Sequence, residues 1–289
     1  MRADDRARIH LTQGATDCVG AGCSSTDRLC SGFTHDDRDN VPTPESQPVM
    51  PGFHAAENGE IHLSGAARLA DLAHDALILR SYPLLAAAAA LEDPGAIGVS
   101  LGESLAPVTA CRSIAPGAQC ALSGSAACAA QDPSAELHAI LDGGPCWRVG
   151  TSLTAVALHA LDAVIEFGEN VGAAVQRVRL PADAANGFQY FIRAPQNEGP
   201  GIARISVAAV RRTDGDVRLV LGGVSTGPYR VYTSVEEEAM AGGLDDDTIA
   251  GLADRALLDA ETDAESTGKV NAAADLLRRA IGKIAANSS

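Results

Sequence analysis

The sequence contains no long hydrophobic run. Its longest unbroken apolar stretch, residues 84–91, is far shorter than the roughly 18 residues that a membrane span needs. The charged beginning, MRADDRARIHLTQG, also lacks the apolar stretch of about 7–15 residues that marks a secretory signal. We therefore expect a cytoplasmic protein without a membrane span, although export together with a partner protein would leave the same sequence.

Basic and aromatic residues are also scarce. The chain has 22 Lys and Arg against 37 Asp and Glu, and its net charge is -15. Proteins bind nucleic-acid backbones by neutralising phosphates with Lys and Arg, so this balance argues against a nucleic-acid partner. One Trp, four Tyr and five Phe are too few to form a broad stacking platform for bases.

Hydrophobic residues make up 46% of the chain, as in an ordinary globular protein, and 289 residues fit one large domain or two. The first part of the chain mixes strands and helices around long polar stretches. The elements predicted there are strands over 8–12, 59–64 and 161–167, and helices over 68–78, 82–92 and 153–161. Residues 20–52 should form a long loop, and residues 95–110 a loop interrupted by glycine or a weak strand.

The last hundred residues follow a different order. Two alternating strands over 203–212 and 216–224 are joined by Asp214-Gly215, a hairpin dipeptide, and Gly222-Gly223 should mark a strand end near a domain interface. Helices follow, the first starting with a capping box of Ser234 and Glu237. Next come an acidic helix start at residues 245–247, an apolar stripe over 249–257 and a final helix over 270–284. This order of elements predicts an α+β architecture.

Four cysteines lie in one irregular tract that is rich in Gly, Ala, Pro and Ser. Their spacing is C-x8-C-x7-C-x17-C, at Cys111, Cys120, Cys128 and Cys146. In a reducing compartment such a group is typical of metal binding or catalysis rather than of two disulfides. The spacing is too wide for the paired C-x2-C of structural zinc, whereas four thiolates on a loop suit an iron–sulfur cluster. Scattered buried free cysteines are the alternative at this point.

Short words along the chain resemble the FAD-binding middle subunit of molybdenum hydroxylases, the family of xanthine dehydrogenase and carbon monoxide dehydrogenase. Their order and spacing carry the resemblance, which covers about residues 8–20 and 59–285. The matching words are Gly14-Ala15-Thr16-Asp17, RLADLAHDALI, YPLLAAAAAL, LDAVIEF, SVAAV, LVLGGVSTGPYR and LLRRAI.

The resemblance implies a fold, a cofactor and partners. It implies an FAD-binding PCMH-type domain over 1–181, with a cysteine-rich insert over about 106–146, and a carbon monoxide dehydrogenase flavoprotein C-terminal-like domain over 187–286. The chain would carry electrons from [2Fe-2S] centres through FAD to an acceptor, beside a large molybdopterin-binding subunit and a small [2Fe-2S] subunit. The residues implied to contact FAD are Gly14, Ala15, Thr16, Asp17, Ser100, Gly102 and Ser104.

Some family members, similar to aldehyde oxidoreductase and 4-hydroxybenzoyl-CoA reductase, carry an additional [4Fe-4S] cluster on the flavin domain. Their cysteine spacing is close to the spacing here, with a His-Ala-Ile-Leu word that matches residues 138–141. The resemblance implies Cys111, Cys120, Cys128 and Cys146 as the cluster ligands. It leaves His138 a packing role or a role outside the ligand set, because four thiolates complete the cluster.

The chain departs from the family pattern at its flavin site. Ala15 replaces a glycine of the first phosphate turn, and the second turn has Glu103, whose carboxylate would repel a diphosphate. The alternative is therefore a structural subunit that keeps the fold, with or without the [4Fe-4S] cluster, and does not bind FAD. A stand-alone metal-binding or zinc protein is a third hypothesis.

Overall fold

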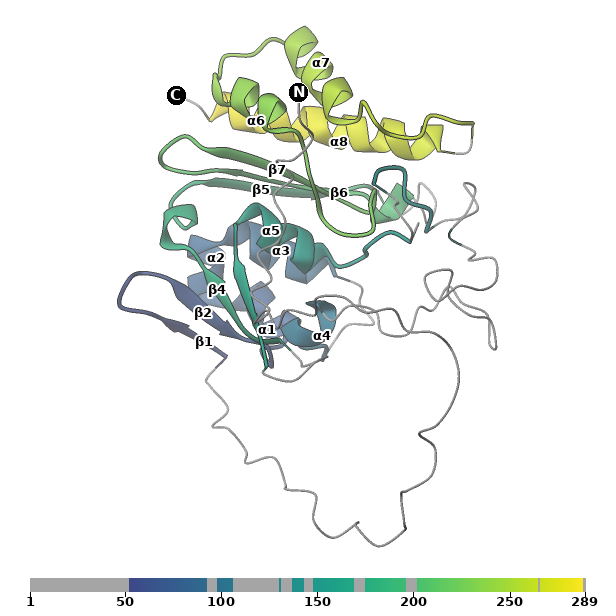
Figure 1. The fold of residues 1–289 in the computed structure, drawn as a ribbon. Helices are drawn as coiled ribbons and strands as arrows, with labels where there is room; N and C mark the ends of the chain where they lie inside the picture. The colour runs from purple at the N-terminus through teal and green to yellow at the C-terminus, as the bar shows by residue number, and fades with distance from the viewer. Residues whose placement is uncertain are drawn as a thin grey trace, which may run out of the picture.

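The computed structural model describes residues 52–92, 98–105, 130, 137–142, 148–168, 175–195, 202–264 and 266–287. These residues form two four-stranded antiparallel sheets and layers of helices (Figure 1). Helices and antiparallel sheets in separate layers are the α+β class, so that prediction is confirmed. Among the described residues, no helix is both long and apolar enough to span a bilayer.

The first sheet combines strands from two distant parts of the chain. It has the order β1-β2-β4-β3, with β2 paired to β4 through Leu63 and Val178. Five helices accompany this sheet in the first half of the fold. The strands are β1 (Phe53–Ala55), β2 (Ile61–Ser64), β3 (Val164–Phe167) and β4 (Val175–Leu180), and the helices are α1 (Leu69–His74), α2 (Ala76–Ser81), α3 (Pro83–Leu91), α4 (Leu101–Leu105) and α5 (Leu153–Ala160).

The second sheet is a meander of consecutive strands in the order β5-β6-β7-β8, followed by three helices. Short 3-10 turns over Ala182–Ala184 and Ile202–Arg204 lie on either side of its first strand. The strands are β5 (Phe188–Arg193), β6 (Ser206–Arg211), β7 (Val217–Gly222) and β8 (Tyr229–Arg230), and the helices are α6 (Thr233–Met240), α7 (Asp246–Ala256) and α8 (Thr267–Ala286).

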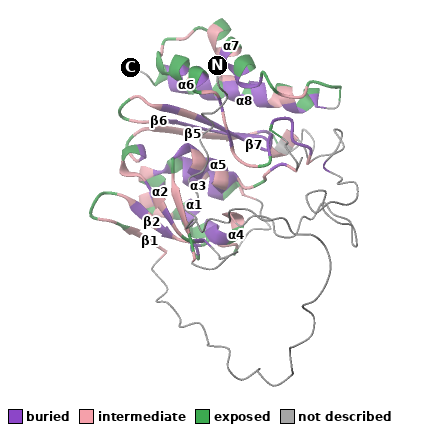
Figure 2. Cartoon of the chain, in the orientation of Figure 1, coloured by how far each residue is buried: buried purple, intermediate pink, exposed green. Residues whose placement is uncertain are grey.

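Helices cover both faces of the second sheet, with α3 and α5 on one side and α6 and α8 on the other, where α7 packs on α6 and α8 (Figure 1). Side chains alternate between the faces of a strand, so neighbouring residues of β6 enter two different cores. Ala208 and Val210 pack with the first sheet and its helices, whereas Val207 and Ala209 pack with α6 to α8. Figure 2 shows the resulting buried band through the middle of the molecule.

Several predicted elements are confirmed. α3 covers most of residues 82–92, the hairpin joins β6 to β7 through Asp214 and Gly215, and α8 buries the predicted stripe of Leu276, Leu277 and Ile281. Gly215 has φ +95°, which the turn requires and glycine adopts readily. Asp245 caps α7 by accepting a hydrogen bond from the Thr248 N–H.

Other predictions were wrong. The helix expected over 68–78 is two helices, because the Asp75 carboxylate accepts from the Leu77 and Ile78 N–H groups and starts a new helix. α6 begins after Tyr232, so Ser234 is not its cap. The expected C-terminal strand pair is a four-stranded sheet, and the loop or weak strand expected over 95–110 contains α4.

The strand at 8–12 and most of the loop at 20–52 lie outside the described residues, and the domain limits stay a prediction.

Candidate functional site

The expected ligands fall into two groups, only one of which the structure describes. Gly14, Ala15, Thr16 and Asp17 of the first phosphate turn, and the four cysteines Cys111, Cys120, Cys128 and Cys146, lie outside the described residues. The assignment of a [4Fe-4S] cluster to those cysteines therefore stays a prediction. Within the described part of the chain, no three His, Cys, Asp or Glu side chains lie close enough together to hold a metal ion.

The second turn, where Ser100, Gly102 and Ser104 were expected to contact FAD, forms the start of α4. The Ser100 hydroxyl accepts from the Glu103 N–H at 3.2 Å, and the Glu103 carboxylate accepts from the Ser100 N–H at 2.7 Å and from its hydroxyl at 2.8 Å. This reciprocal pair is a capping box, which satisfies donors at a helix start. Hydrogen bonds from the backbone and hydroxyl of Ser100 lower the pKa of Glu103, so its carboxylate is charged at neutral pH.

The other backbone donors of this turn also point at the protein's own chain. The Leu101 N–H donates to the Ala67 carbonyl and the Gly102 N–H to the Gly65 carbonyl, each at 2.7 Å. A Cβ atom on Gly102 would lie 2.9 Å from the Gly65 carbonyl oxygen, closer than a side-chain carbon is found to a backbone oxygen. Gly102 is thus needed for close contact with a neighbouring backbone segment.

This geometry does not fit a diphosphate. A phosphate held at such a turn accepts hydrogen bonds from backbone N–H groups that are free to reach it. Here the N–H groups of residues 100–104 all donate to oxygens of the chain, the last of them from Ser104 to the Ser100 carbonyl at 3.1 Å. The structure brings Ser100, Gly102 and Ser104 together, but their arrangement closes the α4 turn instead of opening it to FAD.

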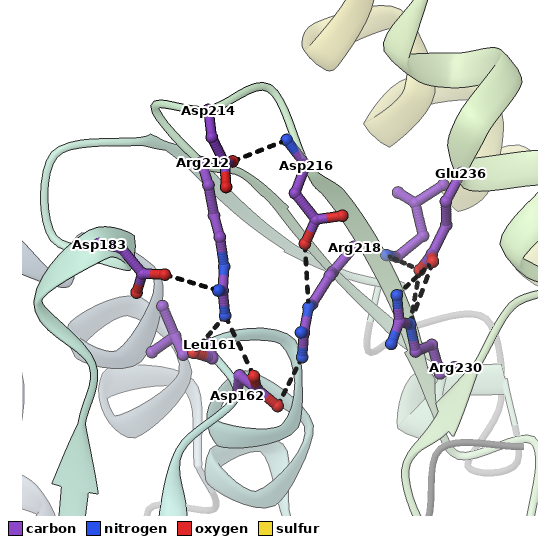
Figure 3. Close-up of polar contacts among 10 residues, drawn as sticks. Leu161, Asp162, Asp183, Arg212, Asp214, Asp216, Arg218, Arg230 and Glu236 are labelled. Carbon is purple, nitrogen blue, oxygen red and sulfur yellow. Dashed lines mark hydrogen bonds and ion pairs between the residues drawn. The ribbon is translucent and has the colours of Figure 1, made fainter.

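Sequence reasoning missed a charged cluster between the end of α5 and the β6–β7 hairpin (Figure 3). Asp162 accepts from Arg218 at 2.6 Å and from Arg212 at 3.4 Å, and Arg212 also donates to Asp183 at 2.7 Å. Asp162 has φ +61°, an uncommon conformation outside glycine that Asp tolerates better than most residues. These ion pairs connect the first half of the fold to the second sheet.

A second ion pair fixes the start of α6 to the second sheet. The Arg230 guanidinium donates to both carboxylate oxygens of Glu236, at 2.7 to 3.1 Å, and the Leu219 N–H also donates to this carboxylate at 2.9 Å (Figure 3). Glu236 is almost completely buried. Burial raises the pKa of Glu236, and its hydrogen bonds with Arg230 oppose that shift. The pair has a structural role, because both carboxylate oxygens of Glu236 accept hydrogen bonds from groups of the chain itself.

Residues 137–142, between the third and fourth cysteines, form a strap across the C-terminal half. The N–H groups of Ile140 and Leu141 both donate to the Val224 carbonyl at 2.9 Å, and the two side chains are buried in the second core. His138 is buried, with one ring nitrogen 2.8 Å from the Ala130 carbonyl and the other 2.8 Å from the Glu261 carboxylate. Both ring nitrogens of His138 are therefore within hydrogen-bond distance of oxygens of the chain.

No protein-family model matches the chain, and no curated protein does. Solved structures of oxidoreductases do match, and each resembles most of this chain. Reconstituted carbon monoxide dehydrogenase from Oligotropha carboxidovorans matches with a TM-score of 0.53 and 13% identity, over 83% of this chain and 79% of that chain.

Two further structures match to a similar extent. Carbon monoxide dehydrogenase from Hydrogenophaga pseudoflava, in a form lacking the Mo-pyranopterin moiety of the molybdenum cofactor, has a TM-score of 0.51 and 18% identity over 81% of this chain and 77% of that chain. Quinoline 2-oxidoreductase from Pseudomonas putida 86 has a TM-score of 0.50 and 17% identity, over 82% and 78%. At this identity the matches show a shared fold.

Proposed function

We propose that the chain is a subunit of a heteromeric oxidoreductase of the molybdenum hydroxylase type, of the aldehyde or aromatic-CoA class. The fold carries this proposal, because chains of carbon monoxide dehydrogenase and quinoline 2-oxidoreductase share it over 81 to 83% of this chain. The matching sequence words support it independently. Its partners would be a large molybdopterin-binding subunit and a small [2Fe-2S] subunit, and substrate would react on the large one.

The chain's own contribution to electron transfer would be an iron–sulfur cluster. Thiolates of Cys111, Cys120, Cys128 and Cys146 would hold the [4Fe-4S] cluster, which supplies one-electron chemistry when bound. Iron and acid-labile sulfide would be measured after anaerobic purification. Cys120→Ser is the test, and Cys18→Ser, which changes a cysteine outside the four-cysteine tract, is the matched control. We expect Cys120→Ser to lose most of the iron and Cys18→Ser to keep it. Zinc without sulfide in the unaltered protein would contradict the assignment.

Electron transfer through FAD is the more demanding role, since it needs both phosphate turns. The α4 turn does not fit a diphosphate, because Glu103 and neighbouring carbonyls already accept its N–H donors. This observation favours the second candidate function, a subunit that contributes the fold and the cluster without FAD. No step through FAD is therefore assigned to this chain.

Anaerobic co-purification of the full chain tests the proposed assembly. The tagged chain would be expressed with its neighbouring genes, and the eluted material analysed for molybdenum, pterin and [2Fe-2S] signals in electron paramagnetic resonance. We expect a complex with all three, containing this chain and two others in fixed proportion. Elution of this chain by itself, free of molybdenum and pterin, would sink the proposal.

A further inference from the structure

A second carboxylate occupies the start of the neighbouring helix. Glu92 follows the last residue of α3, and its carboxylate oxygens accept from the N–H groups of Leu153 and Thr154 at 3.3 and 3.1 Å. These are the first two residues of α5. The Ser152 hydroxyl accepts from the next donor, the Ala155 N–H, at 3.1 Å. The first turn of α5 is thus satisfied by side chains of the same protein, as helix starts require.

α4 meets the start of α5 in one corner. The Ser104 hydroxyl of α4 lies 3.0 Å from the Thr154 hydroxyl of α5, which also lies 3.0 Å from the Ser152 hydroxyl. Thr154 is fully buried. The Glu103 carboxylate caps α4 from its exposed side, and the Glu92 carboxylate caps α5. We call these residues, together with Ser100, the α4–α5 corner.

The α4–α5 corner contains helix N–H groups that could bind an anion, but carboxyl groups of the chain itself already accept from them. Backbone N–H groups and the helix dipole favour a negative charge at a helix start. At α5 the acceptor is the carboxyl group of Glu92, whose pKa is raised by burial although hydrogen bonds from Thr154 and Leu153 partly offset the shift. A bound diphosphate would have to displace the carboxylates or lie beside their negative charge, which repels it.

We propose that Glu92 and Glu103 replace the diphosphate of a nucleotide cofactor in the α4–α5 corner, so that this subunit folds and assembles without FAD. The inference deepens the proposed function, because it defines the cofactor content of the same subunit. It accounts for two glutamates with one physical role, that of accepting the backbone donors of two helices that meet.

Flavin content of the purified chain is the direct test. The full chain, alone and with its partners, would be denatured and the released flavin measured. Thermal unfolding would be followed with FAD, ADP or inorganic pyrophosphate added, because a ligand that binds only the folded state raises the melting temperature. We expect no flavin above background and no shift with any of the three. Near-stoichiometric FAD, or a saturable shift with FAD or pyrophosphate, overturns the inference.

Variants test whether the carboxylates hold the fold. Glu92→Ala leaves the Leu153 and Thr154 donors without their acceptor, so we expect a clear loss of thermal stability, with a smaller loss for the conservative Glu92→Gln. Glu57→Ala, at an exposed turn residue, is the matched control and should leave stability unchanged. If Glu92→Ala and Glu103→Ala were as stable as Glu57→Ala, the built-in anions would have no structural role and the inference would fail.

The two proposals fail in different ways. A complex that contains molybdenum, pterin and one FAD on this chain would overturn the inference and leave the proposed function intact. A flavin-free chain that never joins a molybdenum-containing partner would overturn the proposed function and leave the inference intact.

Discussion

Gly222 ends β7 against α5, where the structure leaves no room for a side chain. A Cβ atom on this residue would lie 2.6 Å from Cγ2 of Val156 and 2.5 Å from the hydroxyl of Ser206. Because the residue is in a strand without positive φ, alanine would fit the backbone, and the cost is the clash alone. We expect Gly222→Ala to lower the free energy of unfolding by about 1–3 kcal/mol, as overpacking of a core does.

The partner in the clash decides how the strain can be relieved. Val156 is buried in a helix and is β-branched, so it is confined to essentially one rotamer, whereas a serine hydroxyl can turn away. Truncating the valine should therefore accommodate the new methyl group. The double variant Val156→Ala/Gly222→Ala should be more stable than the sum of the single effects by about 1–3 kcal/mol. Urea unfolding followed by circular dichroism measures all four proteins.

Gly227 provides the matched control, because a Cβ atom there meets nothing within 4 Å. Gly227→Ala should be neutral in the same assay. The reasoning is refuted if Gly222→Ala is as stable as Gly227→Ala, or if the effects of the double variant are simply additive.

Three further predictions concern polar contacts. Burial acts to raise the pKa of Asp162, yet hydrogen bonds and charge from Arg218 keep this pKa below its usual value. The ion pair should therefore contribute about 0.5–1 kcal/mol to the free energy of unfolding at neutral pH, and this contribution should disappear as the pH falls below about 4. Urea unfolding of Asp162→Asn and of wild type should give the same free energy of unfolding below that pH. Burial and nearby guanidinium groups lower the pKa of His159 to about 4. Between pH 6.5 and 4, His159 is protonated in the unfolded chain but stays neutral in the folded one. As the pH falls through this range, the free energy of unfolding of wild type should decrease by about 3 kcal/mol relative to His159→Gln. The buried Lys269 donates to the His138 carbonyl at 2.9 Å. Lys269→Met should therefore lower the free energy of unfolding, measured by heat or urea, by about 1–3 kcal/mol. An unchanged stability would show that this contact does not hold the strap.

The elements with a clear period were the predictable ones. α3 and α8 follow from runs of good helix formers and an i, i+3, i+4 stripe, and the β6–β7 hairpin from alternation around Asp214-Gly215. β5 was missed because all its residues are partly buried, so no hydrophobic alternation marks it. The break at Asp75 was missed because the apolar period runs on through a side chain that caps a new helix.

Contacts of the candidate site could be predicted from the sequence only where the residues involved are close together in the chain. Ser100 and Glu103 form the S-x-x-E pattern of a capping box, a signal that could have identified the start of α4. Sequence reasoning took Glu103 only as a charge that repels phosphate. Nothing in the sequence indicates that Glu92 caps a helix that begins with Leu153, since that pairing exists only once α3 and α5 have packed.

The strap, residues 137–142, is anchored by contacts with the C-terminal half of the chain. Lys269, Glu261 and Val224 come from three different C-terminal segments, and all of them bind the backbone or side chains of residues 137–142. These contacts anchor residues 137–142 to the second core. The fold therefore fixes part of the stretch between the third and fourth cysteines, which lowers the conformational entropy that a cluster would have to overcome in gathering its ligands.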